Sequence, residues 1–328
     1  MVWSNGFGGI PIFQEFLAYL AEDIPGLRSL NLAAPEKPGM EYGGEEELGS
    51  AILRWAEREG CSINQAGKEQ LENGWAVLRA LGRSVPDRIL KLLRCADLAA
   101  AMNLEAIRGE LGAFDDRLHR LGRPYAGQIV CAQNIRRLVE NSDMVCDRGR
   151  YAFGYDKSPR VQDAICVRAT PQTHGGVRDV FSFVQRQTAA DLAEEERLMA
   201  RTELALTALL TALADLAHIS ERRTFRLNDT HLSYGLPMNL VMGDVGINHG
   251  FPVVQSTQAA LTAELKLLTL PAQLLRAGEE STAYFSWCKV IKAVELTERV
   301  LAVEILMATQ GMDIVAHALP EFSFGAGT

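Results

Sequence analysis

The sequence predicts an all-α protein built from long helices, and three observations support this fold class. No Gly or Pro occurs between residues 177 and 234 or between residues 279 and 310, although turns draw heavily on those two residues. Both runs are rich in helix-forming residues. No segment shows the clean alternation of apolar and polar residues that indicates a strand. The long helices are expected to pack as a bundle in a single domain over residues 1–328.

The positions of Gly and Pro also predict where the individual helices lie. Three shorter helices are predicted first, over residues 12–22, 45–59 and 87–108. Pro86 stands where the third would begin, a position that tolerates the missing N–H of proline. The run from 177 to 234 predicts one very long helix, or two in line, with leucines at helical spacing from Leu204 to Leu216. A second long helix is predicted over residues 279–310.

Two segments are predicted to be long loops. Residues 151–171 are polar and include Gly154 and Pro159, and residues 232–252 are rich in Gly. Long loops in a compact domain are often functional. The glycine-rich stretch from Asn5 to Pro11 follows no predicted strand, so we do not interpret it as a dinucleotide-binding motif.

The composition excludes several classes of function. The chain is 48% hydrophobic and 23% charged, which is ordinary for a folded protein, and its formal charge of −8 disfavours nucleic acid as a partner. Six scattered cysteines form no Cys-x-x-Cys pair, which favours a reducing compartment over a zinc or redox motif. Residues 1–9 lack a signal-peptide pattern and the apolar windows are interrupted, so we expect a soluble, cytoplasmic protein with no membrane partner.

A long motif follows Pro159 and reads Arg160-Val-Gln-Asp-Ala-Ile-Cys-Val-Arg-Ala-Thr-Pro-Gln-Thr-His-Gly-Gly. Shorter segments in order along the chain are Asn103-Leu-Glu-Ala-Ile-Arg-Gly, Ser220-Glu-Arg-Arg, Leu232-Ser-Tyr-Gly-Leu-Pro and Val300-Leu-Ala-Val-Glu. Together they resemble the aromatic amino acid lyases, the family of histidine and phenylalanine ammonia-lyases. The resemblance implies the long-helix bundle of the ammonia-lyase and fumarase-like superfamily, with this chain corresponding to its central and C-terminal part.

The resemblance also implies an electrophilic group, and here the chain departs from the family. Aromatic amino acid lyases cyclise an Ala-Ser-Gly tripeptide into 4-methylideneimidazole-5-one, and the matching segment places Phe7, Gly8 and Gly9 at those positions. Gly8 has no hydroxyl to lose as water, so we expect no such electrophile and no other cofactor. The family's tyrosine in the long motif falls on Ile165, which has no proton to transfer. Counterparts of the family's N-terminal region and of one Ser-Asp-Asn-Pro segment are also expected to be missing.

The residues that remain suggest a binding site. By resemblance, Arg168 matches the arginine that binds the substrate carboxylate, a role for which its fork of donors is suited. Asn73, Gln162 and Asp163 match other family residues, and Glu279 is the candidate catalytic residue, the catalytic groups being otherwise unknown.

Each assignment has a structural alternative. Arg168 could form an ion pair, and Asn73 could cap a helix or close a turn. Glu279 could favour a helix start by its charge, and Asp163 could be purely structural. His174, His231 and His249 lie in family-like segments, but no pair has the i, i+4 spacing of metal ligands, so we expect no metal site.

Three functions stay open. The chain could be a repurposed lyase, isomerase or cyclase that binds an aryl or amino-acid-like carboxylate and works without the electrophile. It could complement a separate N-terminal chain in a two-chain ammonia-lyase. It could also be a non-catalytic subunit of an active lyase. The expected partners are a small-molecule carboxylate and either further copies, as in a homotetramer, or a lyase-like chain in a hetero-oligomer.

Overall fold

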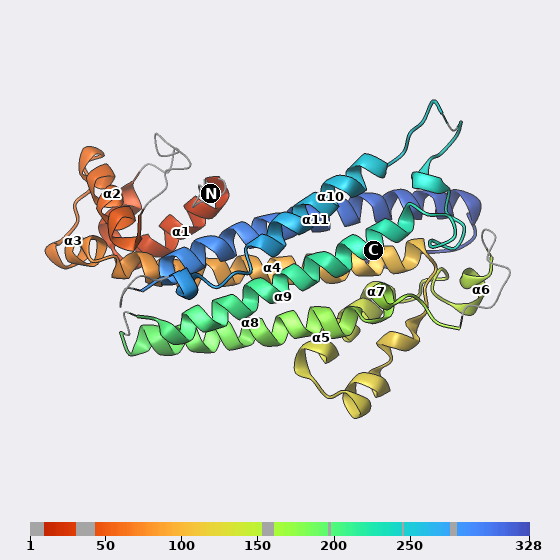
Figure 1. Ribbon diagram of the computed structural model, residues 1–328, viewed down its shortest axis with the longest axis horizontal. Coiled ribbons are helices and arrows are strands. Elements are labelled where there is room, and N and C mark those ends of the chain that lie inside the picture. The colour runs from red at the N-terminus through yellow and green to blue at the C-terminus, as the bar shows by residue number, and fades with distance from the viewer. Residues whose placement is uncertain (1–9, 31–42, 153–160, 196–197, 245, 276–280) are drawn as a thin grey trace. The chain divides into compact units, whose positions relative to one another are not determined.

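The structure is a computed structural model that describes residues 10–30, 43–152, 161–195, 198–244, 246–275 and 281–328. These residues form helices and contain no strand, which confirms the predicted all-α class (Figure 1). The α-helices are α1 Ile10–Asp23, α2 Glu45–Arg58, α3 Gln65–Glu72, α4 Trp75–Ala106, α5 Ala126–Leu138, α6 Asp147–Arg150, α7 Ile165–Arg168, α8 Thr170–Ala193, α9 Ala200–Leu227, α10 Pro252–Leu267 and α11 Ala283–Ala318. Short 3₁₀ or π turns are η1 Pro25–Ser29, η2 Leu111–Phe114, η3 Leu118–Gly122, η4 Met238–Leu240 and η5 Ala272–Leu275.

The chain divides into two compact units. The first unit comprises Met1–Leu90, Ser182–Leu210 and Leu268–Glu295, and the second comprises Lys91–Phe181, Thr211–Leu267 and Leu296–Thr328. Helices α4, α8, α9 and α11 contribute residues to both units. The expectation of a single domain over residues 1–328 stays a prediction.

The run without Gly and Pro is not one helix or two helices in line. Helices α8 and α9 are antiparallel neighbours, because Asp191 near the end of α8 bonds Thr202 at the start of α9 while Thr170 at the start of α8 bonds Arg223 near the end of α9. After the end of α8, Glu195 has a positive φ angle of 52°, and before the start of α9, Met199 has one of 45°. This reversal was missed because non-glycine residues supply the backbone conformation that usually marks a turn by Gly.

The predicted start of the third helix at Pro86 is also wrong. Helix α4 begins at Trp75, and Pro86 lies inside it. The Asn73 side chain accepts a hydrogen bond from the Trp75 backbone N–H at 3.1 Å, so the helix already has a start signal upstream of the proline. Pro86 has no N–H to give to the carbonyl of Gly82, one turn earlier, and the helix continues without that bond.

The other predicted helices are confirmed with shifted ends. Helix α1 covers the predicted segment 12–22, and α2 covers the predicted segment 45–59 except for its last residue. Helix α11 continues past the predicted end at residue 310 and includes Gly311. A Cβ atom at Gly311 would lie 3.1 Å from the Ala106 Cβ atom, so a glycine there permits the close approach of α11 to the end of α4 in the second unit.

The second unit has its own apolar core. Buried members come from α4, α5, α9 and α11 and include Leu104, Ile135, Leu227 and Val315. The predicted loop over residues 232–252 lies between α9 and α10 and contains only the turn η4 as helix among its described residues. Gly250 in this loop has a φ of 69°, and a Cβ atom there would lie 2.2 Å from the Asn239 carbonyl oxygen, so only glycine fits.

Two of the described helices, α9 and α11, are long and apolar enough to cross a membrane by length and composition. About half or more of each apolar stretch is buried inside the structure, at 61% for α9 and 50% for α11. Core helices of a folded protein pass the same test, so this finding is weak evidence for a membrane span.

Candidate functional site

The segment that carries Arg168 is a single helical turn, α7, followed directly by α8. The Arg168 and Ala169 backbone N–H groups donate to the Ala164 and Ile165 carbonyls at 3.0 and 2.8 Å. Pro171 cannot donate to the Val167 carbonyl as an ordinary helical residue would. The Thr170 hydroxyl donates to that carbonyl instead, at 2.7 Å. The threonine therefore satisfies an acceptor that the proline leaves open.

The structure brings Arg168 and Gln162 together. Nη1 of the half-buried Arg168 side chain donates to Oε1 of the exposed Gln162 at 2.5 Å. Its Nε is buried and has no hydrogen-bond partner among the residues that the structure describes. Among the residues that the structure describes, no acidic side chain forms an ion pair with Arg168. The structural alternative for Arg168 was an ion pair, and the described part of the chain contains no such pair.

The neighbours of this pair have different roles. Ile165, which the resemblance places at the position of the family's tyrosine, is 67% exposed. Asp163 is buried, and its Oδ2 accepts a hydrogen bond from the Glu110 backbone N–H at 2.5 Å. Asp163 thus ties the motif to the segment that follows α4, which supports the structural interpretation over an acid/base role.

The remaining predicted site residues lie elsewhere or outside the described ranges. Asn73 belongs to the first unit, ends α3 and caps α4, as its structural alternative predicted. Phe7, Gly8, Gly9 and Glu279 are outside the residues that the structure describes.

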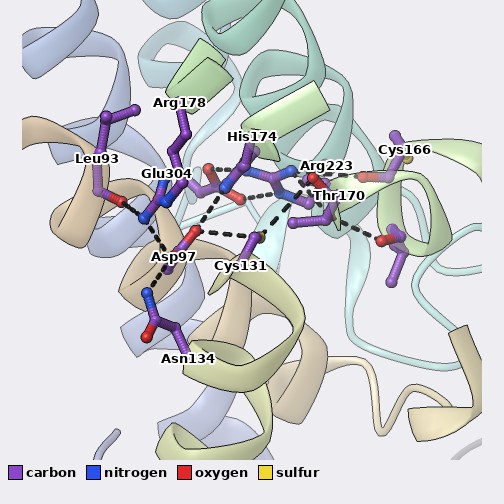
Figure 2. A network of polar contacts seen from close by, with 11 residues as sticks. Leu93, Asp97, Cys131, Asn134, Cys166, Thr170, His174, Arg178, Arg223 and Glu304 are labelled. Carbon is purple, nitrogen blue, oxygen red and sulfur yellow. Dashed lines mark hydrogen bonds and ion pairs between the residues drawn. The ribbon is translucent and has the colours of Figure 1, made fainter. Parts of the chain in front are cut away.

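A buried ion pair lies next to the turn that carries Arg168 (Figure 2). Arg223 on α9 binds Glu304 on α11 with two hydrogen bonds, Nε to Oε1 at 2.5 Å and Nη2 to Oε2 at 2.8 Å. Neither side chain is exposed. The third nitrogen, Nη1, lies 3.3 Å from the Thr170 hydroxyl and 3.5 Å from the Cys166 carbonyl. Arg223 therefore connects two long helices to α7 and the start of α8.

A second buried cluster is centred on the Asp97 carboxylate of α4 (Figure 2). Its Oδ1 accepts from the Cys131 thiol at 3.2 Å and from His174 Nδ1 at 2.9 Å. Its Oδ2 accepts from Asn134 at 2.7 Å and from Arg178 at 2.6 Å. The assignment of the His174 proton to Nδ1 follows from its carboxylate partner. The two clusters meet at Thr170, whose carbonyl lies 3.9 Å from the Cys131 sulfur.

Burial and charge set the protonation states of this cluster. Burial lowers the pKa of His174, although the hydrogen bond to Asp97 opposes this, so the ring is neutral. Burial by itself raises the pKa of Asp97, but the hydrogen bond from His174 and the charge of Arg178 outweigh it and lower the pKa overall. Burial, followed by the nearby Asp97 charge, raises the pKa of the Cys131 thiol well above its usual value. The cluster is therefore an ionised carboxylate held by neutral and cationic donors.

The same three side chains resemble a set of metal ligands. One ligand atom each of Asp97, Cys131 and His174 lies within 4.8 Å of the others, and zinc accepts this donor set. An ionised carboxylate has about four acceptor positions, and the four donors to Asp97 fill them. Arg178 also neutralises its charge. The Asp97 carboxylate is therefore better explained as the filled acceptor of a hydrogen-bond network than as a metal ligand.

Sequence reasoning did not find these two clusters. Asp97, Cys131 and His174 lie on three different helices, and no spacing along the chain connects them. Arg223 and Glu304 do lie in the quoted segments Ser220-Glu-Arg-Arg and Val300-Leu-Ala-Val-Glu. The motifs were the available signal, but only the folded arrangement shows that these two residues meet.

Comparisons with known proteins identify the family of this chain. The model of the family described as aromatic amino acid lyase matches residues 17–194 and 199–327. A histidine ammonia-lyase of Gloeobacter violaceus is 34% identical over 322 residues, covering 91% of this chain and 61% of that protein. A histidine ammonia-lyase of Caldanaerobacter subterraneus is 32% identical, and the match covers 56% of that protein. The chain therefore spans about three fifths of the length of these curated relatives.

Solved structures give the same result. A tyrosine aminomutase from Streptomyces globisporus has a TM-score of 0.74 at 25% identity, covering 92% of this chain and 70% of its own. A histidine ammonia-lyase from Trypanosoma cruzi has a TM-score of 0.64 at 32% identity, covering 80% of this chain and 52% of its own. The family model spans most of the chain, and the fold and the quoted motifs agree with it. The chain therefore belongs to the aromatic amino acid lyase family.

Proposed function

We propose that this chain binds the carboxylate of an aryl or amino-acid-like molecule through Arg168. The observation that carries the proposal is the state of the Arg168 guanidinium. It donates to the neutral Gln162 amide and forms no ion pair with an acidic side chain of the described residues. A half-buried cation that pairs with no acidic side chain of the described residues is well placed to take an anion from a ligand, and guanidinium binds carboxylates with two parallel hydrogen bonds.

The chemistry of the site does not fit the family's electrophile. Gly8, at the position of the serine, has no hydroxyl to eliminate, so we derive no step through 4-methylideneimidazole-5-one. Ile165 supplies no proton at the position of the tyrosine. We infer repurposed general acid/base chemistry, of a lyase, isomerase or cyclase type, with Arg168 orienting the substrate. Relatives named for histidine, tyrosine and phenylalanine suggest a substrate with an aromatic or imidazole side chain.

We also infer a homo-oligomer, most simply a tetramer, in the cytoplasm. Helices α9 and α11 carry exposed apolar side chains, including Leu204 at 63%, Phe225 at 42% and Leu306 at 50%. Such side chains along long helices favour contact with another chain. Light scattering at micromolar concentration should show an oligomer, and a monodisperse monomer would contradict it.

A second candidate function is that of a complementing or non-catalytic subunit of an ammonia-lyase. The observation that favours it is that Gly8 and Ile165, which the resemblance places at the electrophile and tyrosine positions, supply neither of those groups. Under this alternative, the chain would give no turnover alone and would alter turnover only when mixed with a lyase chain.

Matched pairs of ligands test the carboxylate proposal on the unmodified protein. Calorimetric titration would compare L-histidine with histamine, L-tyrosine with tyramine and L-phenylalanine with phenethylamine, which differ by the carboxylate alone. We expect at least one amino acid to bind about tenfold or more tightly than its amine, because a charge-assisted hydrogen bond contributes about 1.5–3 kcal/mol. Equal binding within every pair, or no binding to any ligand, would contradict the proposal. Absorbance assays for conjugated acrylate products, with and without an added histidine ammonia-lyase, separate the two candidate functions.

A further inference from the structure

We propose that Arg223 is a positioning residue for Arg168 and acts through the hydroxyl of Thr170. This inference rests on the proposed function, because it explains what holds the anion-binding arginine in place. Neither Arg223 nor Thr170 is placed to touch the ligand, since both are buried.

Pro171 leaves a gap in the backbone hydrogen bonds that follow α7. The Val167 carbonyl, next to Arg168 in the chain, cannot receive a helical hydrogen bond from Pro171. The Thr170 hydroxyl donates to this carbonyl at 2.7 Å and is therefore the group that closes the turn. A hydroxyl can rotate among several acceptors, so its direction must be set by another group.

Arg223 sets the direction of the Thr170 hydroxyl. Arg223 Nη1 lies 3.3 Å from the Thr170 oxygen and occupies one of its acceptor positions, which leaves the hydroxyl proton for Val167 (Figure 2). The guanidinium cannot turn away, because Glu304 holds Nε and Nη2 together. Nη1 also lies 3.5 Å from the Cys166 carbonyl. Two successive carbonyls of α7 are thus tied to a rigid ion pair.

The tied carbonyls also restrict Arg168. Its backbone follows directly after the two tied carbonyls, and its side chain meets Gln162 six residues earlier. A turn of four residues has few hydrogen bonds of its own and frays easily. Fixing its carbonyls from the buried side therefore fixes the direction in which the Arg168 side chain leaves the backbone. The simpler alternative is that the Arg223–Glu304 pair only joins α9 to α11.

A pair of threonines separates these two interpretations. Thr170→Val removes the hydroxyl that connects Arg223 to the turn while keeping the side-chain volume. Thr224→Val is the matched control: Thr224 is equally buried, neighbours Arg223 in α9, and donates to the Ser220 carbonyl at 3.1 Å. Thr170→Ser restores the hydroxyl without the methyl group. Any general cost of losing a buried hydroxyl should be similar in the two valine variants.

The first readout needs no ligand. Hydrogen exchange by mass spectrometry would follow peptides that cover residues 161–175. The loss of one hydrogen bond should speed exchange of the Arg168 and Ala169 amides about two- to tenfold in Thr170→Val. Thr170→Ser and Thr224→Val should exchange like the parent there. Parent-like exchange in Thr170→Val, or equal acceleration in Thr224→Val, would overturn the proposal.

A second variant covers the case in which Thr170→Val does not fold. Arg223→Met combined with Glu304→Met replaces the buried ion pair by apolar side chains, a change that proteins often tolerate. It removes Nη1 and should speed exchange in the same peptides by a similar factor. Unchanged exchange there would also overturn the proposal.

The second readout connects positioning to binding. L-histidine and L-tyrosine are the probes, and Thr170→Val should raise their dissociation constants about two- to tenfold, with Thr170→Ser and Thr224→Val close to the parent. If Arg168→Ala loses binding but Thr170→Val binds like the parent, the positioning role is wrong and the proposed function stands. If Arg168→Ala binds like the parent, the proposed function is wrong, and hydrogen exchange alone decides the positioning role.

Discussion

Arg223 and Glu304 form a two-point ion pair in which neither side chain is more than 1% exposed. The pair joins α9 to α11 in the second unit. The two buried charges neutralise each other through two hydrogen bonds. The remaining guanidinium nitrogen, Nη1, is directed at Thr170 and Cys166.

Removing one charge of this pair should be costly. Glu304→Gln keeps the shape but leaves Arg223 as an uncompensated buried cation, so we expect the free energy of unfolding to fall by about 3–5 kcal/mol. Urea denaturation measures this directly. The double variant with methionine at both positions should recover much of the loss. A Glu304→Gln protein within about 1 kcal/mol of the parent would show that the pair is not structurally important.

The buried His174 predicts a pH dependence of stability. Because its pKa is lowered from 6.5, the unfolded chain binds a proton below that pH which the folded chain does not. The free energy of unfolding should therefore fall as the pH drops below 6.5, by at most about 1.4 kcal/mol per pH unit from this residue. The lowered pKa of Asp97 has the same sign and acts below pH 3.8.

Denaturation series between pH 7.5 and 5 test this point. His174→Asn removes the titrating ring while keeping a side-chain N–H near Asp97, so its stability should change less steeply over this range. His231→Asn replaces an exposed histidine and serves as the control, with the slope of the parent. Identical slopes in all three proteins would contradict the assignment of His174.

Asp191 should be the main stabiliser of the reversal between α8 and α9. Its buried carboxylate accepts from the Thr202 backbone N–H, the Thr202 hydroxyl and Arg201 Nε at 2.6–2.8 Å. Asp191→Ala should lower the free energy of unfolding by about 2–3 kcal/mol, since it removes charge-assisted bonds and a helix cap.

Glu194→Ala is the control for this measurement. Glu194 pairs with the same Arg201 but is 62% exposed, and an exposed ion pair contributes little to stability. Equal losses in the two variants would mean that Arg201, rather than the buried carboxylate, carries the effect.

The long helices could be predicted from the sequence because their signals lie within each helical segment. The absence of Gly and Pro and the leucine spacing indicated α8, α9 and α11. The reversal at Glu195 and Met199 could not be predicted, since those residues take positive φ only where tertiary bonds such as those of Asp191 compensate. Local propensity cannot show such compensation.

The same distinction holds for the site. Arg168 and Gln162 lie six residues apart in one motif, and in the structure their side chains are in contact. The clusters around Asp97 and Arg223 draw on helices far apart in sequence, so their meeting depends on the packing of the second unit. The local signals at Asn73 described a helix cap equally well, and the structure shows that cap.

The missing electrophile is a direct prediction of the tripeptide at Phe7 to Gly9. Intact mass spectrometry of the purified chain should give the mass of the sequence without the loss of two water molecules. A histidine ammonia-lyase that carries Ala-Ser-Gly is the positive control and should show the loss. A mass lower by two waters, with the matching near-ultraviolet absorbance, would place the electrophile elsewhere in this chain.

The central claim is that Arg168 binds a carboxylate, and calorimetric titration of Arg168→Ala tests it most directly. The ligand is whichever of L-histidine, L-tyrosine and L-phenylalanine the parent binds best, and Arg186→Ala, an exposed arginine bonded to Ser182, is the control. We predict that Arg168→Ala weakens binding by about tenfold to more than a hundredfold, that Arg168→Lys recovers little, and that Arg186→Ala binds like the parent. Binding by a folded Arg168→Ala protein as tight as that of the parent would contradict the account.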